Sequence, residues 1–343
     1  MSSTSLAQWP ERVLVTGGSG FIGTNLVEVL RASGSSLVNL DIAAPKTADH
    51  ATYWQRVDIL DLAALRAAFA AFRPELVIHL AARTDLDEKR SLDGYEANIR
   101  GVSNVIDAIQ SVGGVRRTFF ASSRLVCRIG YVPRHETDYC PTTLYGRSKV
   151  EGERLVRAAG PEIGHWTLLR FTSIWGPWFG TPYNPFFSWI QKGAYVHPGR
   201  LDPQKSYGYV GNIIHELRCL ATVPSENIAG RTFYVADYPP LRLRSWAALI
   251  AAAEGAKRIR SVPLSLLKVG AALGDVMEWA RLGHAPLTTF RLNNLITDMV
   301  YDTAPLEALV GPLPFSLGQG VEETVAWLRD QRRAVYTPAN PRY

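Results

Sequence analysis

A tyrosine and a lysine, Tyr145 and Lys149, stand four residues apart in the segment TLYGRSK. If this segment is helical, the two side chains lie on the same face, one turn apart. A free tyrosine has a pKa of about 10, so its phenolate is rare at neutral pH unless a positive charge lies nearby. Lys149 would supply that charge, and the tyrosine could then accept the proton of a hydroxyl group. The spacing alone also fits a second interpretation, in which the aromatic ring packs against the aliphatic part of the lysine.

A glycine-rich turn near the amino end indicates a nucleotide-binding loop. The apolar run VLVT leads directly into TGGSGFIG, where Gly17, Gly20 and Gly23 have the spacing of a dinucleotide fingerprint. Glycines at these positions allow a sharp turn, a close approach to a pyrophosphate and close packing of the following helix. The first residues of that helix, Phe21 and Ile22, would present backbone N–H groups and the positive end of the helix dipole to the phosphates.

Asp41 ends the next apolar run, LVNLD, about twenty residues after the loop, as the fingerprint expects. A carboxylate there accepts hydrogen bonds from an adenosine 2′-hydroxyl and repels a 2′-phosphate, so Asp41 favours NAD over NADP. The alternative is that Asp41 only caps a turn at the end of a strand.

The elements that must position these residues alternate between strands and helices from residue 11 to 172. The strand candidates are VLVT, LVNLD, YWQRVDI, ELVIHLA, RRTFFASS and WTLLRFT. The helical segments between them are FIGTNLVEVLRAS, LAALRAAFAAF, DGYEANIRGVSNVIDAIQ and the segment that holds Tyr145. This alternation predicts an α/β domain of the Rossmann type, a doubly wound parallel sheet.

After residue 173 the alternation ends, and Pro, Gly and aromatic residues crowd SIWGPWFGTPYNPFFSW. We expect a smaller, mostly helical substrate-binding lobe over residues 173–330, with RTFYVAD near residue 231 as an exceptional strand. Later segments can return to the first domain. Residues 1–10 and 331–343 are expected to be tails.

Composition excludes several classes of protein. The chain has 343 residues, 47% of them hydrophobic, which suits two domains with buried cores. The net charge is +6, but the basic residues are scattered and no nucleic-acid-binding motif is present. The amino end lacks the pattern of a secretory signal, and three cysteines without a C-x-x-C pair suggest free thiols, no metal site and a cytoplasmic protein.

The apolar stretch 263–280 contains Lys268, Asp275 and Glu278, which is wrong for a membrane span. A packed amphipathic helix, or a helix that contacts a partner, fits this stretch better.

Together these features resemble a known family, the extended short-chain dehydrogenase/reductases, in the NAD-dependent epimerase/dehydratase branch that works on nucleotide-activated sugars. The resemblance covers about residues 12 to 330 and is strongest over the first 180. The matching pieces are TGGSGFIG, VDILD, HLAAR, ANIRGVSN, FFASSRLV, YGRSK and RFTSIWGPW.

The resemblance implies NAD as the cofactor and assigns further residues to its site. Asp58 and Ile59 would contact the adenine, and Asn98 would support the site from a neighbouring helix. Leu80, Ala81 and Ala82 would line the cofactor cleft. The resemblance also implies a homodimer, formed through the helix that bears Tyr145 and its neighbour.

The resemblance also defines a catalytic set. Ser123, at the end of FFASS, matches the family's serine that hydrogen-bonds the reacting hydroxyl group. Tyr145 would take the hydroxyl proton while the carbinol hydride passes to NAD, and Lys149 would hold the nicotinamide ribose.

The residues after Ser123 discriminate among the family's reactions. Sugar 4,6-dehydratases carry an Asp-Glu pair there, whereas this chain has Arg124 and Leu125. Epimerisation, expected at C4 through a transient keto-sugar, therefore fits better than elimination of water. By position, Lys205 and Arg291 fall where relatives place arginines for the sugar-nucleotide diphosphate, although solvent-exposed basic residues are the alternative.

Several positions depart from the family pattern and leave the sugar open. Cys127, Ser173, Gly211 and Asn212 each replace a residue that is usual in the family. The aromatic residues Trp175, Trp178, Phe179 and Tyr183 could stack a nucleobase or form the core of the lobe.

Two other functions remain as alternatives. An NAD-dependent sugar or 3β-hydroxysteroid-type dehydrogenase/reductase would use the same serine, tyrosine and lysine. A non-catalytic dinucleotide-sensing protein would not need them, so the intact set argues against it.

Overall fold

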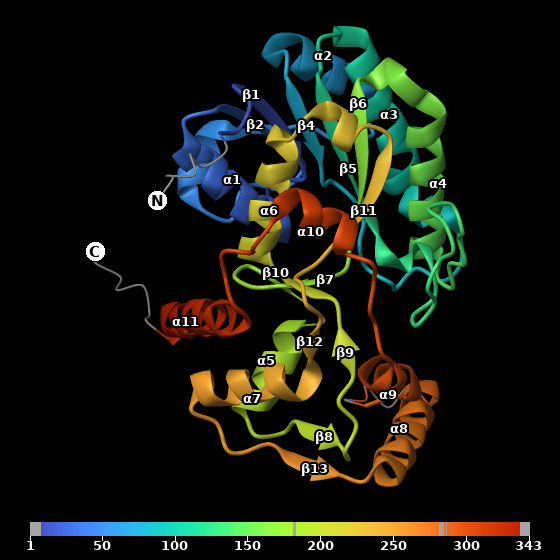
Figure 1. The fold of residues 1–343 in the computed structure, drawn as a ribbon, viewed down its shortest axis with the longest axis vertical. Coiled ribbons are helices and arrows are strands. Elements are labelled where there is room, and N and C mark those ends of the chain that lie inside the picture. Colours follow the sequence, from blue (N-terminus) through green and yellow to red (C-terminus); the bar gives the residue numbers. More distant parts are fainter. Residues whose placement is uncertain (1–7, 181–182, 281–284, 286, 337–343) are drawn as a thin grey trace. The chain divides into compact units, whose positions relative to one another are not determined.

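The computed structural model describes residues 8–180, 183–280, 285 and 287–336 of the chain, which divides into two compact units (Figure 1). The first unit holds the described residues up to Ile174, together with Val210–Ala236 and Tyr301–Pro314. The second unit holds Trp175–Tyr209, Asp237–Val300 and the described residues from Phe315 onward.

The first unit is built on a seven-stranded sheet with the order β11-β6-β5-β4-β1-β2-β3, in which every pair of neighbours is parallel. Its strands are β1 (Arg12–Thr16), β2 (Ser36–Asp41), β3 (Trp54–Arg56), β4 (Leu76–His79), β5 (Arg117–Ser123), β6 (His165–Phe171) and β11 (Arg231–Val235). The central strands are apolar and buried, as expected for a parallel sheet whose two faces are both covered. The predicted doubly wound Rossmann-type fold is confirmed.

The strand RTFYV is the main difference from the sequence prediction. It was placed among the segments of the second lobe, with the allowance that later segments return to the first domain. As β11 it extends the main sheet, with Arg231 opposite Thr167 and Val235 opposite Phe171. Two parallel strands such as β6 and β11 need a crossover connection, and helix α6 (Val210–Thr222) lies in the segment that connects them. Helix α10 (Ala304–Val310) packs on α6 and also belongs to this unit.

Four helices connect the first strands: α1 (Phe21–Ser33), α2 (Leu62–Phe72), α3 (Glu96–Val112) and α4 (Leu144–Ala159). Short 3-10 turns lie at η1 (Ala48–Tyr53), η2 (Leu92–Tyr95), η3 (Arg124–Val126), η4 (Gly160–Ile163) and η5 (Ser225–Asn227). Thr143 caps α4 by accepting a hydrogen bond from the N–H of Gly146, so the TLYGRSK segment forms a helix as predicted. Helix α3 packs against both α2 and α4.

The second unit is mostly helical, as predicted. Its helices are α5 (Tyr183–Gln191), α7 (Leu243–Glu254), α8 (Leu264–Trp279), α9 (Thr289–Ile296) and α11 (Leu317–Tyr336). Two short strand pairs join β8 (Val196–Pro198) to β13 (Arg260–Val262) and β9 (Gln204–Lys205) to β12 (Leu241–Arg242). The short strands β7 (Ser173–Trp175) and β10 (Tyr207–Tyr209) complete the set of described elements.

An aromatic cluster forms the core of the second unit. The ring of Trp175 lies 5.4 Å from Trp246 and 6.1 Å from Phe187, and all three side chains are buried. Phe179 packs edge-on against Phe187. These contacts support the lobe-core interpretation of Trp175 and Phe179. The side chain of Tyr183 lies outside the described residues. Among the described residues, no helix has the length and apolar character needed to cross a membrane.

Candidate active site

The glycine loop lies at the carboxyl end of β1 and is pressed against the segment that follows β4. Gly17 has a φ of +77°, and a Cβ added there would lie 2.5 Å from the backbone nitrogen of Ala81. A Cβ on Gly23 would lie 2.3 Å from the carbonyl oxygen of Gly17, so α1 can approach the loop only because this residue is glycine. Gly20 is the N-cap of α1, which has no side-chain cap. Phe21 and Ile22 open this helix, as expected.

Two side chains of β2 anchor the loop. Asn39, buried in the middle of the strand, accepts a hydrogen bond from the N–H of Gly18 at 2.9 Å and donates one to the Ser19 hydroxyl at 3.2 Å. Asp41 accepts from the N–H groups of Ser19 at 3.0 Å and Ala43 at 2.9 Å. The structure therefore places Asp41 beside the loop. Asn39 was not predicted, although a polar residue inside the apolar run LVNLD was the available signal.

The other predicted cofactor residues lie along the same edge of the sheet or close to it. Leu80 donates its N–H to the carbonyl of Thr16 at 2.9 Å, which holds the 80–82 segment next to the end of β1. Asp58 accepts from the N–H of Leu60 at 2.9 Å. The side chain of Ile59 is buried in the hydrophobic core of the first unit, so the predicted adenine contact would use its backbone.

Asn98 connects this edge to α4. Its side-chain oxygen accepts the N–H of Arg83, and its amide group donates to the carbonyl of Arg83 and the hydroxyl of Ser148, each at 2.9 Å. These bonds fix the loop after β4 against the helix that carries Tyr145. This geometry agrees with the supporting role expected for Asn98.

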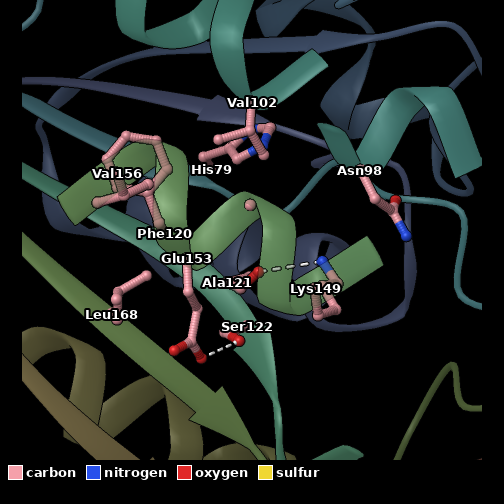
Figure 2. Close-up of a pocket in the computed structure, with 11 residues that line it drawn as sticks. His79, Asn98, Val102, Phe120, Ala121, Ser122, Lys149, Glu153, Val156 and Leu168 are labelled. Carbon is pink, nitrogen blue, oxygen red and sulfur yellow. Dashed lines mark hydrogen bonds between the residues drawn. The ribbon is translucent and has the colours of Figure 1, made fainter. Parts of the chain in front are cut away.

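Ser123, Tyr145 and Lys149 come together at the carboxyl end of β5, and each is only 6–8% exposed. Ser123 is the last residue of β5 and hydrogen-bonds the side chain of Tyr145. The Lys149 ammonium lies 5.9 Å from the centre of the Tyr145 ring and donates to the carbonyl of Ala121 at 3.0 Å (Figure 2). The three predicted catalytic side chains are therefore neighbours.

Burial sets the protonation of this cluster. Burial raises the pKa of Tyr145 to about 12, although the hydrogen bond with Ser123 and the charge of Arg124 act to lower it. Burial also lowers the pKa of Lys149 to about 8, opposed by the carboxylate of Glu153. Lys149 was expected to favour the phenolate of Tyr145, but in the chain by itself the loss of hydration of the phenolate has the larger effect on the pKa of Tyr145.

A buried ion pair supports Lys149 from the next turn of α4, and sequence reasoning missed it. Glu153 accepts two hydrogen bonds from Arg170 of β6, at 2.8 Å each, and both side chains are at most 1% exposed. Glu153 also accepts from Ser122 at 2.6 Å and from Tyr139 at 2.8 Å. Ser122, the neighbour of Ser123 in β5, is thus part of this network. The spacing of Tyr145, Lys149 and Glu153, every fourth residue on one face, was the signal.

A small pocket lies between α3, α4 and the sheet, next to Lys149 (Figure 2). Its lining residues are His79, Asn98, Val102, Phe120, Ala121, Ser122, Lys149, Gly152, Glu153, Val156 and Leu168. Burial and the charge of Lys149 lower the pKa of His79 to about 3, so this histidine is neutral. Its Nδ1 lies 2.7 Å from the Thr16 hydroxyl, which joins β4 to the start of the glycine loop.

The two residues predicted to bind a diphosphate lie in the second unit and are already engaged. Lys205 is fully buried, and its ammonium donates to the carbonyls of Asn294 and Thr297 at the end of α9. This placement argues against the diphosphate contact predicted for Lys205, because the ammonium is buried and already donates to backbone carbonyls. Arg291 is partly exposed, hydrogen-bonds the carbonyl of Ala285 and lies 3.7 Å from Glu278.

Comparison with known proteins identifies the family. Residues 13–236 match the NAD dependent epimerase/dehydratase family. This chain belongs to that family. It is 27% identical over 328 residues to N-acetyl-alpha-D-glucosaminyl-diphospho-ditrans,octacis-undecaprenol 4-epimerase of Escherichia coli O157:H7, covering 92% of this chain and 95% of the relative. It is 29% identical over 261 residues to 3 beta-hydroxysteroid dehydrogenase/Delta 5-->4-isomerase of Mycobacterium tuberculosis, covering 72% of this chain and 70% of the relative.

Solved structures show the same fold. The UDP-glucose 4-epimerase of Thermus thermophilus, solved with NAD, is 25% identical and has a TM-score of 0.67, with 93% of this chain and 99% of that chain covered. The UDP-glucose 4-epimerase of Thermotoga maritima, solved with UDP-glucose, is 20% identical with a TM-score of 0.72 and the same coverage. The family match and the relatives show that the chain is an enzyme of the extended short-chain dehydrogenase/reductase type.

The residues of this family member fit the NAD that the family uses. At Gly17 and Gly23 a Cβ would fill the space needed for the tight turn, and the loop leads into the N-terminus of α1, where backbone N–H groups suit a pyrophosphate. The carboxylate of Asp41 stands beside this loop, where it suits a ribose diol.

Proposed function

We propose that this chain is an NAD-dependent epimerase of a sugar carried on a diphosphate, acting at C4 through a transient keto-sugar. The observation that carries the proposal is the buried contact of Ser123, Tyr145 and Lys149 at the sheet edge that also carries the glycine loop. Arg124 and Leu125 follow Ser123 in place of the acidic pair of dehydratases. The site thus has one group for proton transfer and lacks the extra acid and base that elimination would need at this position.

The residues of the chain have separate tasks in this mechanism. Ser123 hydrogen-bonds the reacting hydroxyl group and fixes its oxygen near Tyr145. Tyr145 removes the hydroxyl proton and returns it after the keto-sugar has turned to present its other face. The glycine loop and Asp41 would hold NAD, which would supply the acceptor and the source of the carbinol hydride.

Lys149 adjusts the acidity of Tyr145. The pKa of Tyr145 is raised to about 12, so the tyrosine needs a positive charge nearby to act as a base near neutral pH. Below its own pKa of about 8, Lys149 provides this charge 5.9 Å from the ring. The carbonyl of Ala121 and the carboxylate of Glu153 keep the ammonium in place and charged.

A nucleotide is the first candidate for the group that carries the sugar diphosphate. UDP-glucose 4-epimerases share the fold at full length, which supports this choice. A polyprenyl lipid is the second candidate, because the Escherichia coli relative, matched over nearly its whole length, is named for an undecaprenol-linked sugar diphosphate.

A 3β-hydroxysteroid-type dehydrogenase remains the alternative activity, supported by a relative of similar identity that is matched over less of its length. We keep a cytoplasmic homodimer, joined through α4 and α3, as part of the same proposal.

The first experiment is to incubate the purified protein with NAD and a panel of UDP-, GDP- and dTDP-sugars and an undecaprenyl-diphosphate sugar. Absorbance of NADH and the stereochemistry of the sugar are followed together. An inverted sugar without accumulated NADH supports the epimerase. A 3β-hydroxysteroid is incubated with NAD in parallel, and stoichiometric NADH from it or from a sugar would replace the epimerase with a dehydrogenase.

The variant Tyr145→Phe tests the proton transfer. We expect turnover to fall by about 10²- to 10⁴-fold, the usual contribution of a positioned acid–base group, while NAD binding measured by calorimetry stays unchanged. Tyr131→Phe, which removes a hydroxyl group bonded to Asp138 outside the cluster, should keep the wild-type rate. A Tyr145→Phe variant as fast as wild type would show that another group moves the proton.

A further inference from the structure

Helix α8 carries a stripe of exposed apolar side chains, which we call the α8 stripe. Its members are Leu266, Val269, Leu273, Val276 and Met277. The first four are each 58–61% exposed, and Trp279 at the end of the helix is 85% exposed. Spacings of three, four, three and one residues put all five members on one side of the helix. Large apolar residues that gather on one exposed face mark a contact surface.

The stripe is not the face by which α8 is held in its own unit. Leu267, Ala271 and Gly274 form a separate buried face that packs toward α9 and Leu287. The approach is so close that a Cβ on Gly274 would lie 1.8 Å from the carbonyl oxygen of Leu287. Helix α8 therefore packs in its unit through this buried face, and the stripe is an additional apolar face.

The charged residues before and within α8 are mainly basic. From residue 255 to 273 the chain contains four basic residues, Lys257, Arg258, Arg260 and Lys268, and no acidic residue, and all four are exposed. The acidic residues of the last turns are engaged elsewhere in the unit. Asp275 accepts the N–H of Thr289 at 3.0 Å, and Glu278 lies 3.7 Å from Arg291.

We propose that the α8 stripe rests on the surface of a membrane that contains anionic phospholipids. A helix of this kind lies in the plane of the interface, with its apolar residues at the boundary of headgroups and acyl chains. The flanking basic residues are attracted by the negative surface potential of such a membrane. A second copy of this chain fits less well, because a two-fold contact through the stripe would bring the same basic residues together.

This contact goes beyond the proposed activity and does not depend on it. The stripe lies wholly in the second unit, whereas Ser123, Tyr145 and Lys149 belong to the first. A soluble nucleotide-sugar substrate and a membrane-bound enzyme are compatible, and so are an inactive enzyme and a membrane contact. Vesicle binding and turnover therefore fail or succeed separately.

The test is co-sedimentation of the full chain with sucrose-loaded vesicles. One set contains phosphatidylcholine alone, and the other contains phosphatidylcholine and phosphatidylglycerol. We expect the wild-type chain to bind the anionic vesicles and to bind the neutral ones more weakly. In the double variant Leu266→Ser/Leu273→Ser, the affinity for the anionic vesicles should fall by at least about tenfold. Lys257→Gln/Arg258→Gln should weaken binding to the anionic vesicles only. Val132→Ser, which changes a 73% exposed valine of the first unit, is the matched control and should bind as wild type.

Three outcomes would overturn the proposal. The wild-type chain could stay in the supernatant with both kinds of vesicle, or the stripe variant could bind as wild type does. The chain could also be a dimer that dissociates in the stripe variant, measured by light scattering without lipid, which would mean that a second copy covers the stripe. Circular dichroism and thermal melting establish that each variant is folded. Trp279→Phe adds a spectroscopic check, because it should remove the blue shift of tryptophan emission on adding anionic vesicles.

Discussion

Helices α4 and α8 have the same length, 16 residues each, and opposite relations to their surroundings. Helix α4 buries polar side chains: Ser148, Lys149 and Glu153 are all at most 6% exposed. Helix α8 leaves large apolar side chains such as Leu273 in water. The buried polar groups of α4 each have a partner, whereas the described residues of the second unit leave the stripe of α8 exposed. A helical pattern in a sequence therefore predicts a helix but not what covers each of its faces.

The largest effect is expected from Glu153→Gln, which breaks the polar network under α4. The neutral amide leaves the guanidinium of Arg170, which is 1% exposed, without its charged partner. Removing one member of a buried pair costs about 3–5 kcal/mol, and we expect the free energy of unfolding in urea to fall by that amount. Glu151→Gln is the control on the same helix. Its carboxylate is 40% exposed and pairs with Arg154, so the change should stay within about 1 kcal/mol. Equal losses in the two variants would contradict the network.

A smaller effect separates the two apolar faces of α8. Leu267→Ala empties a buried position, and we expect a loss of about 2–5 kcal/mol in the free energy of unfolding. Leu273→Ala changes a residue that is 61% exposed, and the loss should stay within about 0.5 kcal/mol. Urea titrations of dilute protein without lipid measure both. If Leu273→Ala cost as much as Leu267→Ala, the stripe would be covered in solution and the contrast with α4 would disappear.

The fold was largely predictable because its signals are local. The glycine spacing of the TGGSGFIG loop and the alternation of strands and helices up to residue 172 need only neighbouring residues. The placement of β11 was not predictable in this way. RTFYV has the composition of a strand, but its sheet is decided by pairing with β6, whose partner residues lie 64 positions earlier in the chain.

In the candidate site, too, the features with a local sequence signal were predictable and those that depend on distant residues were not. The spacing of Tyr145 and Lys149 indicated their contact, since it repeats with the helix. Glu153 continues that spacing, but a glutamate on a helix normally faces water, and its partner Arg170 comes from a strand. The fully buried ammonium of Lys205 was equally unexpected. The direction of the Tyr145 pKa shift depends on how completely the ring is buried, which the spacing does not give.

The smallest effect tests how burial acts on Lys149. Burial lowers the pKa of this lysine from 10.5 to about 8. Between these two values the unfolded chain binds more protons at Lys149 than the folded protein does, so this residue makes the free energy of unfolding rise with pH. Below pH 8 both states are protonated and the cost of burying the charge is fully present. The raised pKa of Tyr145 acts in the opposite direction, but only above its ordinary value of 10.

Measurements between about pH 7.5 and about pH 9.5 therefore isolate the lysine. Over this interval we expect the free energy of unfolding of wild type to rise by about 1–2 kcal/mol relative to Lys149→Met. The exposed Lys192 provides the control, because folding leaves its ammonium in water, and Lys192→Met should follow the wild-type pH dependence. A constant difference between wild type and Lys149→Met would mean that water reaches the ammonium in the folded protein. In that case α4 would hold its lysine as an ordinary surface helix does, and its contrast with α8 would rest on Glu153 alone.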